Sequence, residues 1–360
     1  MNTIKGMRIH WLGFSRIVLR FLAVGCLAMG VPASPQNSAT PNIPVIHATS
    51  DLVLLDAQVV NSKNNPPSFA LNTGDFTLRE NGVPQKILYC SRNQLPLSIV
   101  MLFDLTDTVQ PKLTSLSAKA QDILSHLRPQ DEVAVMTFSS TTQLIQPFTG
   151  DHRVIAEAIR KAAQSRSKEA TFADEVVDQA ASEAANATNP QSRRVLLFFT
   201  DGTTNAPGAY ARKISPSAPT KLHTKYEAQQ NLLEHGITVS ALIERSVLTE
   251  ASLIEENVNP VGILFSHALG YYDDGKTFQR YANLTGGPYL KANNADSAAQ
   301  MIKLLDELHN RYTLGYRPSS PCAEGNFCRI SLQFSGKAIA QHPELKANHF
   351  KINIRSGYYK

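Results

Sequence analysis

The sequence predicts an α/β protein with a Rossmann-like, doubly wound and mostly parallel sheet, flanked by small β segments. Three continuous apolar runs, at residues 97–103, 133–138 and 195–199, have the character of parallel strands buried on both faces. Between and after these runs, apolar residues recur at helical spacing. Strands and helices therefore alternate from residue 96 to residue 311, as parallel strands joined by crossover helices require.

Four helices are predicted from apolar residues spaced three or four positions apart. A further helix ends before Gly236, and strands are predicted at 237–242 and 288–290. The four helical patterns are Leu113, Leu116, Ala120, Leu124 and Leu127; Val154, Ile155, Ala158, Ile159 and Ala162; Val176, Val177, Ala180, Ala181 and Ala184; and Ala298, Met301, Ile302, Leu305 and Leu308.

Short strand-like segments flank this α/β region. Residues 51–95 contain several of them, with a turn at Asn81-Gly82, and predict an N-terminal β module. Residues 312–360 return to strands and predict a C-terminal β segment. Because small β modules are poorly stable alone, we expect the two segments to pack on each other or on the α/β domain at 96–311.

The first 33 residues resemble a secretory signal. A basic stretch ends at Arg20, an apolar run of eleven residues follows, and small residues surround a cleavage point after Ala33. The apolar run is shorter than the roughly 20 residues that a membrane span needs, so we expect no membrane span after cleavage. Cys26 weakly resembles a lipoprotein site, but the apolar run continues beyond it. Residues 34–50 are rich in Pro, Ser and Asn and predict a disordered linker. We therefore expect an exported protein, periplasmic or secreted.

The formal charge of +5 gives no argument for an anionic partner. Four cations and no acids lie in the predicted signal, so its removal leaves a charge of +1. A nearly neutral protein gives no reason to expect binding to nucleic acid.

The cysteines suggest a local disulfide. Cys322 and Cys328 are six residues apart with Gly325-Asn326 between them, which suits a disulfide closing a hairpin in an oxidising compartment. Cys90 would then be unpaired. No spacing of cysteine and histidine is typical of zinc.

Polar residues follow two of the apolar runs and predict a ligand site. Asp104 ends the first run and Asp201 follows the third. Ligands of open α/β sheets lie beyond the carboxyl ends of strands, where the strand order reverses. Thr106 and Thr108 follow Asp104 closely enough to aim their hydroxyls at the same point. Carboxylates and hydroxyls are hard oxygen donors that suit Mg²⁺, Mn²⁺ or Ca²⁺.

Three motifs, in order, resemble the von Willebrand factor A (VWA) domain. Residues 102–108 read Leu-Phe-Asp-Leu-Thr-Asp-Thr and resemble the family's Asp-x-Ser-x-Ser motif, with threonines for both serines. Residues 170–174 resemble its threonine motif, with Ala170 where glycine is usual, and residues 199–202 resemble its later aspartate motif. Residues 75–85, 312–318 and 355–358 further resemble the flanks of a VWA-related group common among acidobacteria.

The resemblance implies a metal-ion-dependent adhesion site. Its metal ligands would be Asp104, Thr106, Thr108, Thr171 and Asp201, with Asp107 and Asp174 orienting waters and ligands around them. Mg²⁺ is the expected ion, with Mn²⁺ or Ca²⁺ as alternatives. In the family, an acidic side chain of a partner protein completes the coordination. We therefore expect adhesion-type binding to a protein with an exposed Asp or Glu, and no enzymatic activity.

Three alternatives stay open. In the first, Thr106 or Thr108 simply caps the first helix and Asp201 holds a turn beside Gly202. A metal-assisted hydrolase would use the same ion to activate water, with Asp107 or Asp174 as its base. A metal-free structural module of the cell envelope would have a dead site.

Residues 270–277 match the phosphate-loop pattern G-x-x-x-x-G-K-[ST], but we reject ATP as a ligand. Asp273 and Asp274 would place two negative charges where phosphates must lie, and Tyr271 and Tyr272 are bulky there. A helix-capping turn explains the match. The histidines, His223 among them, are scattered and predict surface or packing positions.

Overall fold

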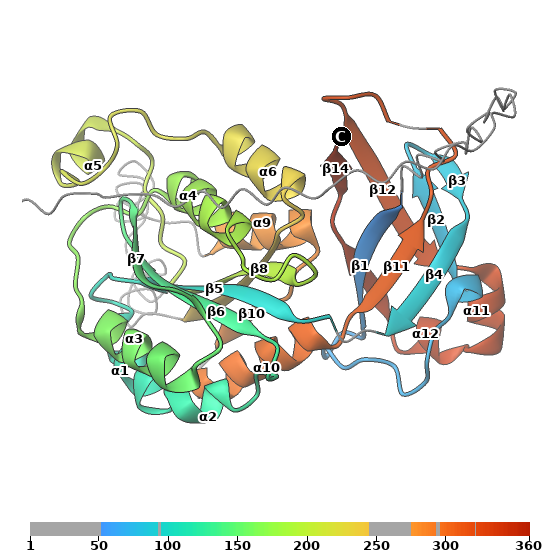
Figure 1. Ribbon diagram of the computed structural model, residues 1–360, viewed down its shortest axis with the longest axis horizontal. Helices are drawn as coiled ribbons and strands as arrows, with labels where there is room; N and C mark the ends of the chain where they lie inside the picture. Colours follow the sequence, from blue (N-terminus) through green and yellow to red (C-terminus); the bar gives the residue numbers. More distant parts are fainter. Residues whose placement is uncertain (1–51, 93–94, 245–274, 293–295, 321) are drawn as a thin grey trace, which may run out of the picture. The chain divides into compact units, whose positions relative to one another are not determined.

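The computed structural model describes residues 52–92, 95–244, 275–292, 296–320 and 322–360 (Figure 1). The predicted signal at 1–33, the linker at 34–50, Cys26 and the first five residues of the phosphate-loop pattern lie outside these ranges. Within them, no helix has both the length and the apolar character that crossing a membrane requires.

A six-stranded sheet lies at the centre of the α/β region, in the order β10-β9-β8-β5-β6-β7. Its strands run parallel except β7, which pairs antiparallel to β6. The predicted fold class is confirmed. The strands are β5 (Leu97–Asp104), β6 (Glu132–Phe138), β7 (Thr142–Thr149), β8 (Arg193–Thr200), β9 (Thr238–Glu244) and β10 (Tyr289–Ala292).

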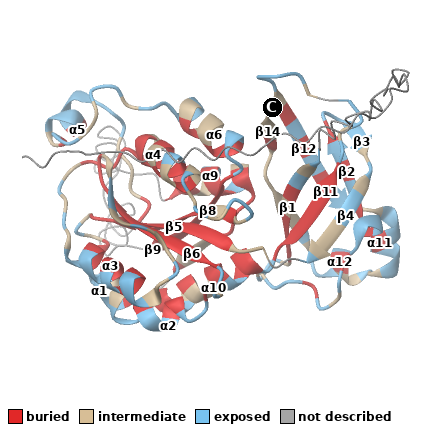
Figure 2. Ribbon diagram, in the orientation of Figure 1, coloured by how far each residue is buried: buried red, intermediate tan, exposed pale blue. Residues whose placement is uncertain are grey.

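Helices cover both faces of this sheet and bury its strands (Figures 1 and 2). Every residue of β5, β6 and β9 is buried, as expected for apolar runs between two helical layers. One layer contains α1 (Gln110–Ala118), α2 (Ala120–Leu124), α3 (His152–Gln164) and α10 (Ser297–His309). The other contains α4 (Ala173–Ala185), α6 (Lys225–Glu234) and α9 (Lys276–Thr285).

The flanking segments pair with each other into two four-stranded antiparallel sheets around one apolar core. Strand β1 lies between β11 and β13, and β12 lies between β2 and β14. In β2 and β12 buried and exposed residues alternate, as in sheets with one solvated face. The strands are β1 (Val53–Val60), β2 (Phe76–Glu80), β3 (Val83–Gln85), β4 (Ile87–Arg92), β11 (Tyr312–Tyr316), β12 (Phe327–Phe334), β13 (Lys351–Ile354) and β14 (Gly357–Tyr359).

Several elements differ from the sequence prediction. The single helical pattern at 113–127 is divided into α1 and α2 at Lys119. The edge strand β7 was missed because only half of its residues are apolar and most of them are partly or fully exposed. Four short elements of low periodicity were also missed: η1 (Thr73–Asp75), α5 (Ala209–Lys213), α11 (Gly336–Gln341) and α12 (Glu344–Ala347).

A disulfide joins Cys322 to Cys328, with their Cα atoms 6.1 Å apart. Cys90 is a free, half-buried thiol on β4. The disulfide therefore closes the turn that leads into β12.

We predict that Gly287→Ala destabilises the α/β region. A Cβ at Gly287 would lie 1.9 Å from the carbonyl oxygen of Val239 in β9, so the connection from α9 to β10 would have to move away from the sheet. Such overpacking should lower the free energy of unfolding by about 3 kcal/mol, measured by denaturant titration. Gly336→Ala is the control, because its Cβ meets nothing within 4 Å. Equal stability of the two variants would contradict the prediction.

Candidate metal centre

Asp104 and Asp201 meet where the strand order of the central sheet reverses. From β5 the chain continues to β6 and β7 on one side, then returns to β8 on the other side of β5. Asp104 is the last residue of β5, and Asp201 directly follows β8. Both carboxylates therefore lie at the carboxyl edge of two neighbouring parallel strands, which is where open α/β sheets bind ligands.

Direct hydrogen bonds join four of the five predicted ligands. The Thr106 amide donates to Asp104 Oδ1 at 2.9 Å. The hydroxyls of Thr106 and Thr108 are 3.2 Å apart, and the Thr108 hydroxyl donates to Asp201 Oδ2. The loop after β5 thus turns both hydroxyls towards the space between the two carboxylates, as the spacing of these residues predicted.

The fifth predicted ligand, Thr171, is tied to the loop after β8. Its amide donates to Asn205 Oδ1 at 2.8 Å, and its carbonyl oxygen accepts from the Asn205 amide at 2.8 Å. Thr171 is buried, so this two-point contact fixes its loop beside the loop that begins with Asp201. Asn205 itself was not predicted, since a contact between residues 34 apart leaves no local signal.

Thr200 is a second site residue that sequence reasoning missed. Its hydroxyl donates to Asp104 Oδ2 at 2.5 Å and accepts from the Gly202 amide at 3.0 Å. It therefore orients the Asp104 carboxylate and begins the turn that carries Asp201. Its position directly before Asp201 was the available signal.

The electrostatics of the pair favour a bound cation. Asp104 is fully buried, and burial together with the negative charge of Asp201 raises the pKa of Asp104 to about 7, against the lowering effect of its hydrogen bonds from Thr200 and Thr106. A divalent ion would offset both the desolvation and the repulsion.

The donor set also fits such an ion. Across the described ranges, no three His, Cys, Asp or Glu side chains gather into a metal-binding group. Here two carboxylates combine with hydroxyl oxygens instead, and these are hard donors suited to Mg²⁺.

Helix capping does not explain the two threonines after β5. Helix α1 begins at Gln110, its cap residue is Val109, and no side chain caps it. Asp201 does hold a turn, since its Oδ1 accepts from the Thr203 amide at 2.8 Å. Its other oxygen is the one that faces Thr108.

The two carboxylates expected around the ligands lie apart from this network. Asp107 is exposed. Asp174, in the first turn of α4, accepts a 2.5 Å hydrogen bond from the hydroxyl of Tyr281, a fully buried residue of α9. Within the described part of the chain, no hydrogen bond or ion pair joins either carboxylate to Asp104 or Asp201.

The sequence profile of the von Willebrand factor type A domain matches residues 99–203, from within β5 to the turn after β8. The chain contains a von Willebrand factor type A domain. No curated protein sequence matches the chain. The matched span includes the five predicted ligands of the VWA domain.

Solved structures that match the chain include the following three, each at low sequence identity. The conserved hypothetical protein BatB from Bacteroides thetaiotaomicron is 17% identical, with 59% of this chain and 97% of that chain covered and a TM-score of 0.36. The von Willebrand factor type A protein from Catenulispora acidiphila is 9% identical, with 79% and 70% covered and a TM-score of 0.41. The vWF domain of the type V pili tip protein Mfa5 from Porphyromonas gingivalis is 11% identical, with 60% and 95% covered and a TM-score of 0.35.

The glycine that opens α9 has a packing role in the VWA domain. The Gly275 amide donates to the Gly202 carbonyl oxygen at 3.3 Å, and a Cβ on Gly202 would lie 2.6 Å from Gly275 Cα. Both glycines have positive φ, which is +82° at Gly202 and +72° at Gly275. Close backbone contact beside Asp201, together with left-handed geometry, thus accounts for this glycine of the phosphate-loop pattern.

The carboxylate of Glu169 holds the loop that leads to Thr171. It accepts from the hydroxyl of Ser140 after β6 and, at 2.8 Å, from the hydroxyl of Ser217. The next amide, of Ala170, donates to the Ser215 hydroxyl at 3.0 Å. Three loops at the carboxyl edge of the VWA sheet are thereby fastened together.

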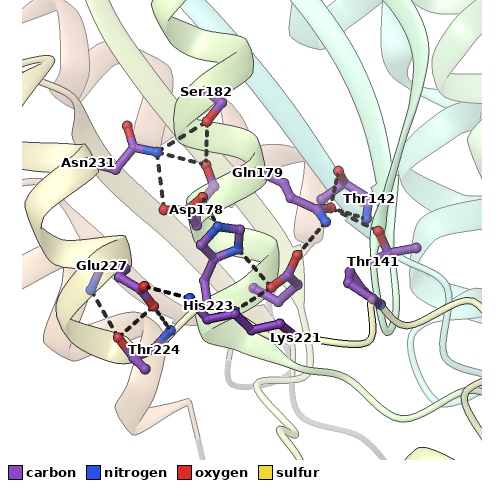
Figure 3. Close-up of polar contacts among 12 residues, drawn as sticks. Thr141, Thr142, Asp178, Gln179, Ser182, Lys221, His223, Thr224, Glu227 and Asn231 are labelled. Atoms are coloured by element: carbon purple, nitrogen blue, oxygen red, sulfur yellow. Dashed lines mark hydrogen bonds and ion pairs between the residues drawn. The ribbon is translucent and has the colours of Figure 1, made fainter.

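His223 lies directly before the cap residue of α6 and contacts acidic side chains of α4 (Figure 3). Its amide and its Nδ1 contact the buried carboxylate of Glu175 on α4, at 2.7 and 2.9 Å, and its Nε2 lies 3.4 Å from Asp178 Oδ2. Partial burial lowers the pKa of His223. The hydrogen bond to Glu175 and the charges of Asp178, Glu175 and Glu227 outweigh it and raise the pKa above 6.5. His223 therefore positions the segment before α6 against α4.

We predict that this anchor weakens as pH rises. The histidine is protonated more readily in the folded state, so its stabilising effect is complete below pH 6.5 and is lost as pH rises through the raised pKa. The difference in unfolding free energy between the unmodified protein and His223→Ala should be larger at pH 5.5 than at pH 8.5. Denaturant titration at both pH values measures it. A difference that does not change with pH would refute the anchor's dependence on charge.

Proposed function

We propose that this VWA domain binds a partner protein through a divalent cation, and that an exposed Asp or Glu of the partner completes the coordination. The observation that carries the proposal is the convergence of Asp104, Asp201 and two threonine hydroxyls at the strand-order reversal. Thr171, whose backbone is bonded through Asn205 to the loop that follows Asp201, would be the fifth ligand.

Each residue would contribute to ion binding in a different way. Asp104 is fixed by the Thr106 amide and the Thr200 hydroxyl, so its carboxylate needs little reorganisation to bind. The Thr108 hydroxyl and the Asp201 carboxylate are joined by a hydrogen bond. A bound ion would replace that bond by contacting the Thr108 hydroxyl oxygen and the Asp201 carboxylate oxygen. When bound, a Mg²⁺ ion supplies the positive charge that attracts a carboxylate, because two carboxylates and neutral hydroxyls do not over-neutralise it. Mn²⁺ and Ca²⁺ are the alternative ions.

We propose a binding role rather than hydrolysis. A metal-assisted hydrolase needs a base within reach of the activated water. The two acids considered for that role are an exposed Asp107 and an Asp174 that accepts a hydrogen bond from Tyr281. Neither is held at the ligand cluster, whereas the cluster itself suits capture of a carboxylate.

We further propose that the protein acts outside the cytoplasm, in the periplasm or secreted. The signal-like pattern of residues 1–33 supports export. The disulfide between Cys322 and Cys328 is consistent with an oxidising compartment. A partner on the cell surface or in the envelope would be accessible there.

We predict that Asp104→Ala abolishes metal binding. Calorimetric titration of the purified protein with Mg²⁺, Mn²⁺ and Ca²⁺ should show one site, and the variant should bind at least about 100-fold more weakly because a direct ligand is lost. Asp104→Asn should weaken binding as strongly while keeping the hydrogen-bonding shape of the side chain, so a folding defect cannot explain both results. Asp122→Ala, which removes an exposed carboxylate from α2, is the control. Unchanged metal affinity in both Asp104 variants would refute the proposed site.

We predict that Thr108 contributes its hydroxyl and that its methyl group crowds the ion. Thr108→Val keeps the shape but removes the oxygen, so metal affinity should fall about tenfold or more. Thr108→Ser keeps the oxygen and removes the methyl, so affinity should be equal or higher. The same calorimetric titration compares the two variants. If Thr108→Val bound the ion as well as the unmodified protein, Thr108 would not be a ligand.

A further inference from the structure

A crevice of about 460 Å³ lies at the other edge of the central sheet from the metal centre. Arg193 and Arg194 open β8 at this edge, and Thr238 opens β9. The opposite wall comes from the flanking strands, with Leu54 and Asp56 of β1 and Thr313 of β11. A crevice of this size between two packed parts of a chain is where small-molecule sites commonly occur.

Among the described residues, three arginines and one acid, Asp56, line this crevice. Arg193 forms an ion pair within the fold: its Nε lies 2.9 Å from Asp56 Oδ1. Its other nitrogens donate to the Leu308 carbonyl and the Thr313 hydroxyl. Arg193 and Asp56 therefore form a structural pair. The two remaining guanidinium groups, of Arg194 and Arg355, have no acid of their own in the lining.

Arg194 and Arg355 converge on one turn. Arg194 Nη1 donates to the carbonyl oxygen of His235 at 3.4 Å. Arg355 Nη2 donates to the Leu54 carbonyl oxygen at 2.8 Å, and a Cβ on Gly236 would lie 3.2 Å from Arg355 Nη1. The two guanidinium groups thus reach adjacent residues from opposite walls of the crevice.

Both groups keep an unsatisfied donor. The Nε atoms of Arg194 and Arg355 are buried and have no hydrogen-bond partner among the described residues. Burial lowers the pKa of Arg355 even though Asp56, Tyr316 and Tyr358 favour its charged form. A buried donor on a charged group is costly to leave unpaired. An anion in the crevice would compensate the positive charge of both guanidinium groups and would therefore be favourable.

Most of the surface that lines the crevice is apolar, although polar residues such as Gln191 and Ser192 also contribute. Leu54, Leu95, Pro190 and Ile237 contribute to it, and nearly half of the Leu54 side chain is exposed although it lies on a strand. An inorganic ion would leave this surface in contact with water. A ligand with an oxyanion head and an apolar body would use both parts.

We propose that this crevice is a binding site for a small organic anion, whose carboxylate or phosphate head pairs with Arg194 and Arg355 and whose apolar body lies along Leu54, Leu95 and Ile237. Guanidinium groups suit both heads, because each presents paired donors to two oxygens. The site is separate from the metal centre and does not depend on it.

Calorimetry on the purified protein tests the proposal with three probes: hexanoate, hexyl phosphate and the neutral hexanamide. We expect one of the anions or both to bind at a single site and hexanamide to bind at least tenfold more weakly. In Arg194→Gln the Kd of the bound anion should rise at least tenfold. Arg160→Gln is the matched control, since Arg160 is a surface residue of α3 that pairs with Glu157. Arg355→Gln provides a second variant of the crevice if Arg194→Gln fails to fold.

The outcomes distinguish a carboxylate ligand from a phosphate ligand, and both from the absence of an anion site. Binding of hexanoate alone assigns a carboxylate ligand, and binding of hexyl phosphate alone assigns a phosphate ester. Failure of both anions to bind, equal binding of hexanamide, or an unchanged Kd in the crevice variants would overturn the proposal. The arginines would then serve only to hold the flanking strands against β8.

Discussion

Seven consecutive residue pairs join β5 to β8, from Leu97 opposite Arg193 to Phe103 opposite Phe199. This register brings the ends of both strands to the same level, so that the Thr200 hydroxyl reaches Asp104 and Asp201 comes next in the chain. A slip of one residue would turn the strand's side chains to the opposite faces of the sheet and separate these groups. The apolar side chains on both faces of the two strands prevent such a slip, since each is buried in a helical layer. The packing of the core thus determines the geometry of the polar edge.

The strands and helices that could be predicted are those whose burial is uniform or periodic, because the local sequence pattern then identifies the element. The largely apolar runs in β5, β6 and β8 and the periodic helices α3, α4 and α10 need only their own sequence to be recognised. Strand β7 escaped recognition because it is an edge strand, whose side chains are half-exposed and whose pairing with β6 has irregular register. The pairing of β1 with β11 joins residues more than 250 positions apart. No local pattern encodes which of several short strands meet across that distance.

At the candidate site, too, positions with a local sequence pattern were predictable and contacts between distant residues were not. Asp104 and Asp201 were predictable because each follows an apolar run and the topology of doubly wound sheets brings such positions together. Thr106 and Thr108 followed from their spacing to Asp104. The contributions of Thr200 and Asn205 are hydrogen bonds between loops, and these depend on the exact path of the backbone after β8. The anchoring of His223 on α4 is likewise a tertiary contact of a residue that the sequence placed only near a helix.

The buried charges at the two edges of the central sheet are balanced differently. At the amino edge, Arg193 pairs with Asp56, and the charge left over is the positive charge of Arg194 and Arg355. At the carboxyl edge, Asp104 and Asp201 repel each other, and burial adds to the cost of ionising Asp104. Hydrogen bonds from Thr200 and Thr106 reduce this cost without cancelling it, because the pKa of Asp104 stays raised. The fold places two acids beside each other and fixes their orientation with hydroxyl and amide donors. Among the described residues, no basic side chain forms a hydrogen bond or ion pair with either acid, so a cation would complete this arrangement. The carboxyl edge therefore has the electrostatic character of a site whose charge is balanced from outside the chain.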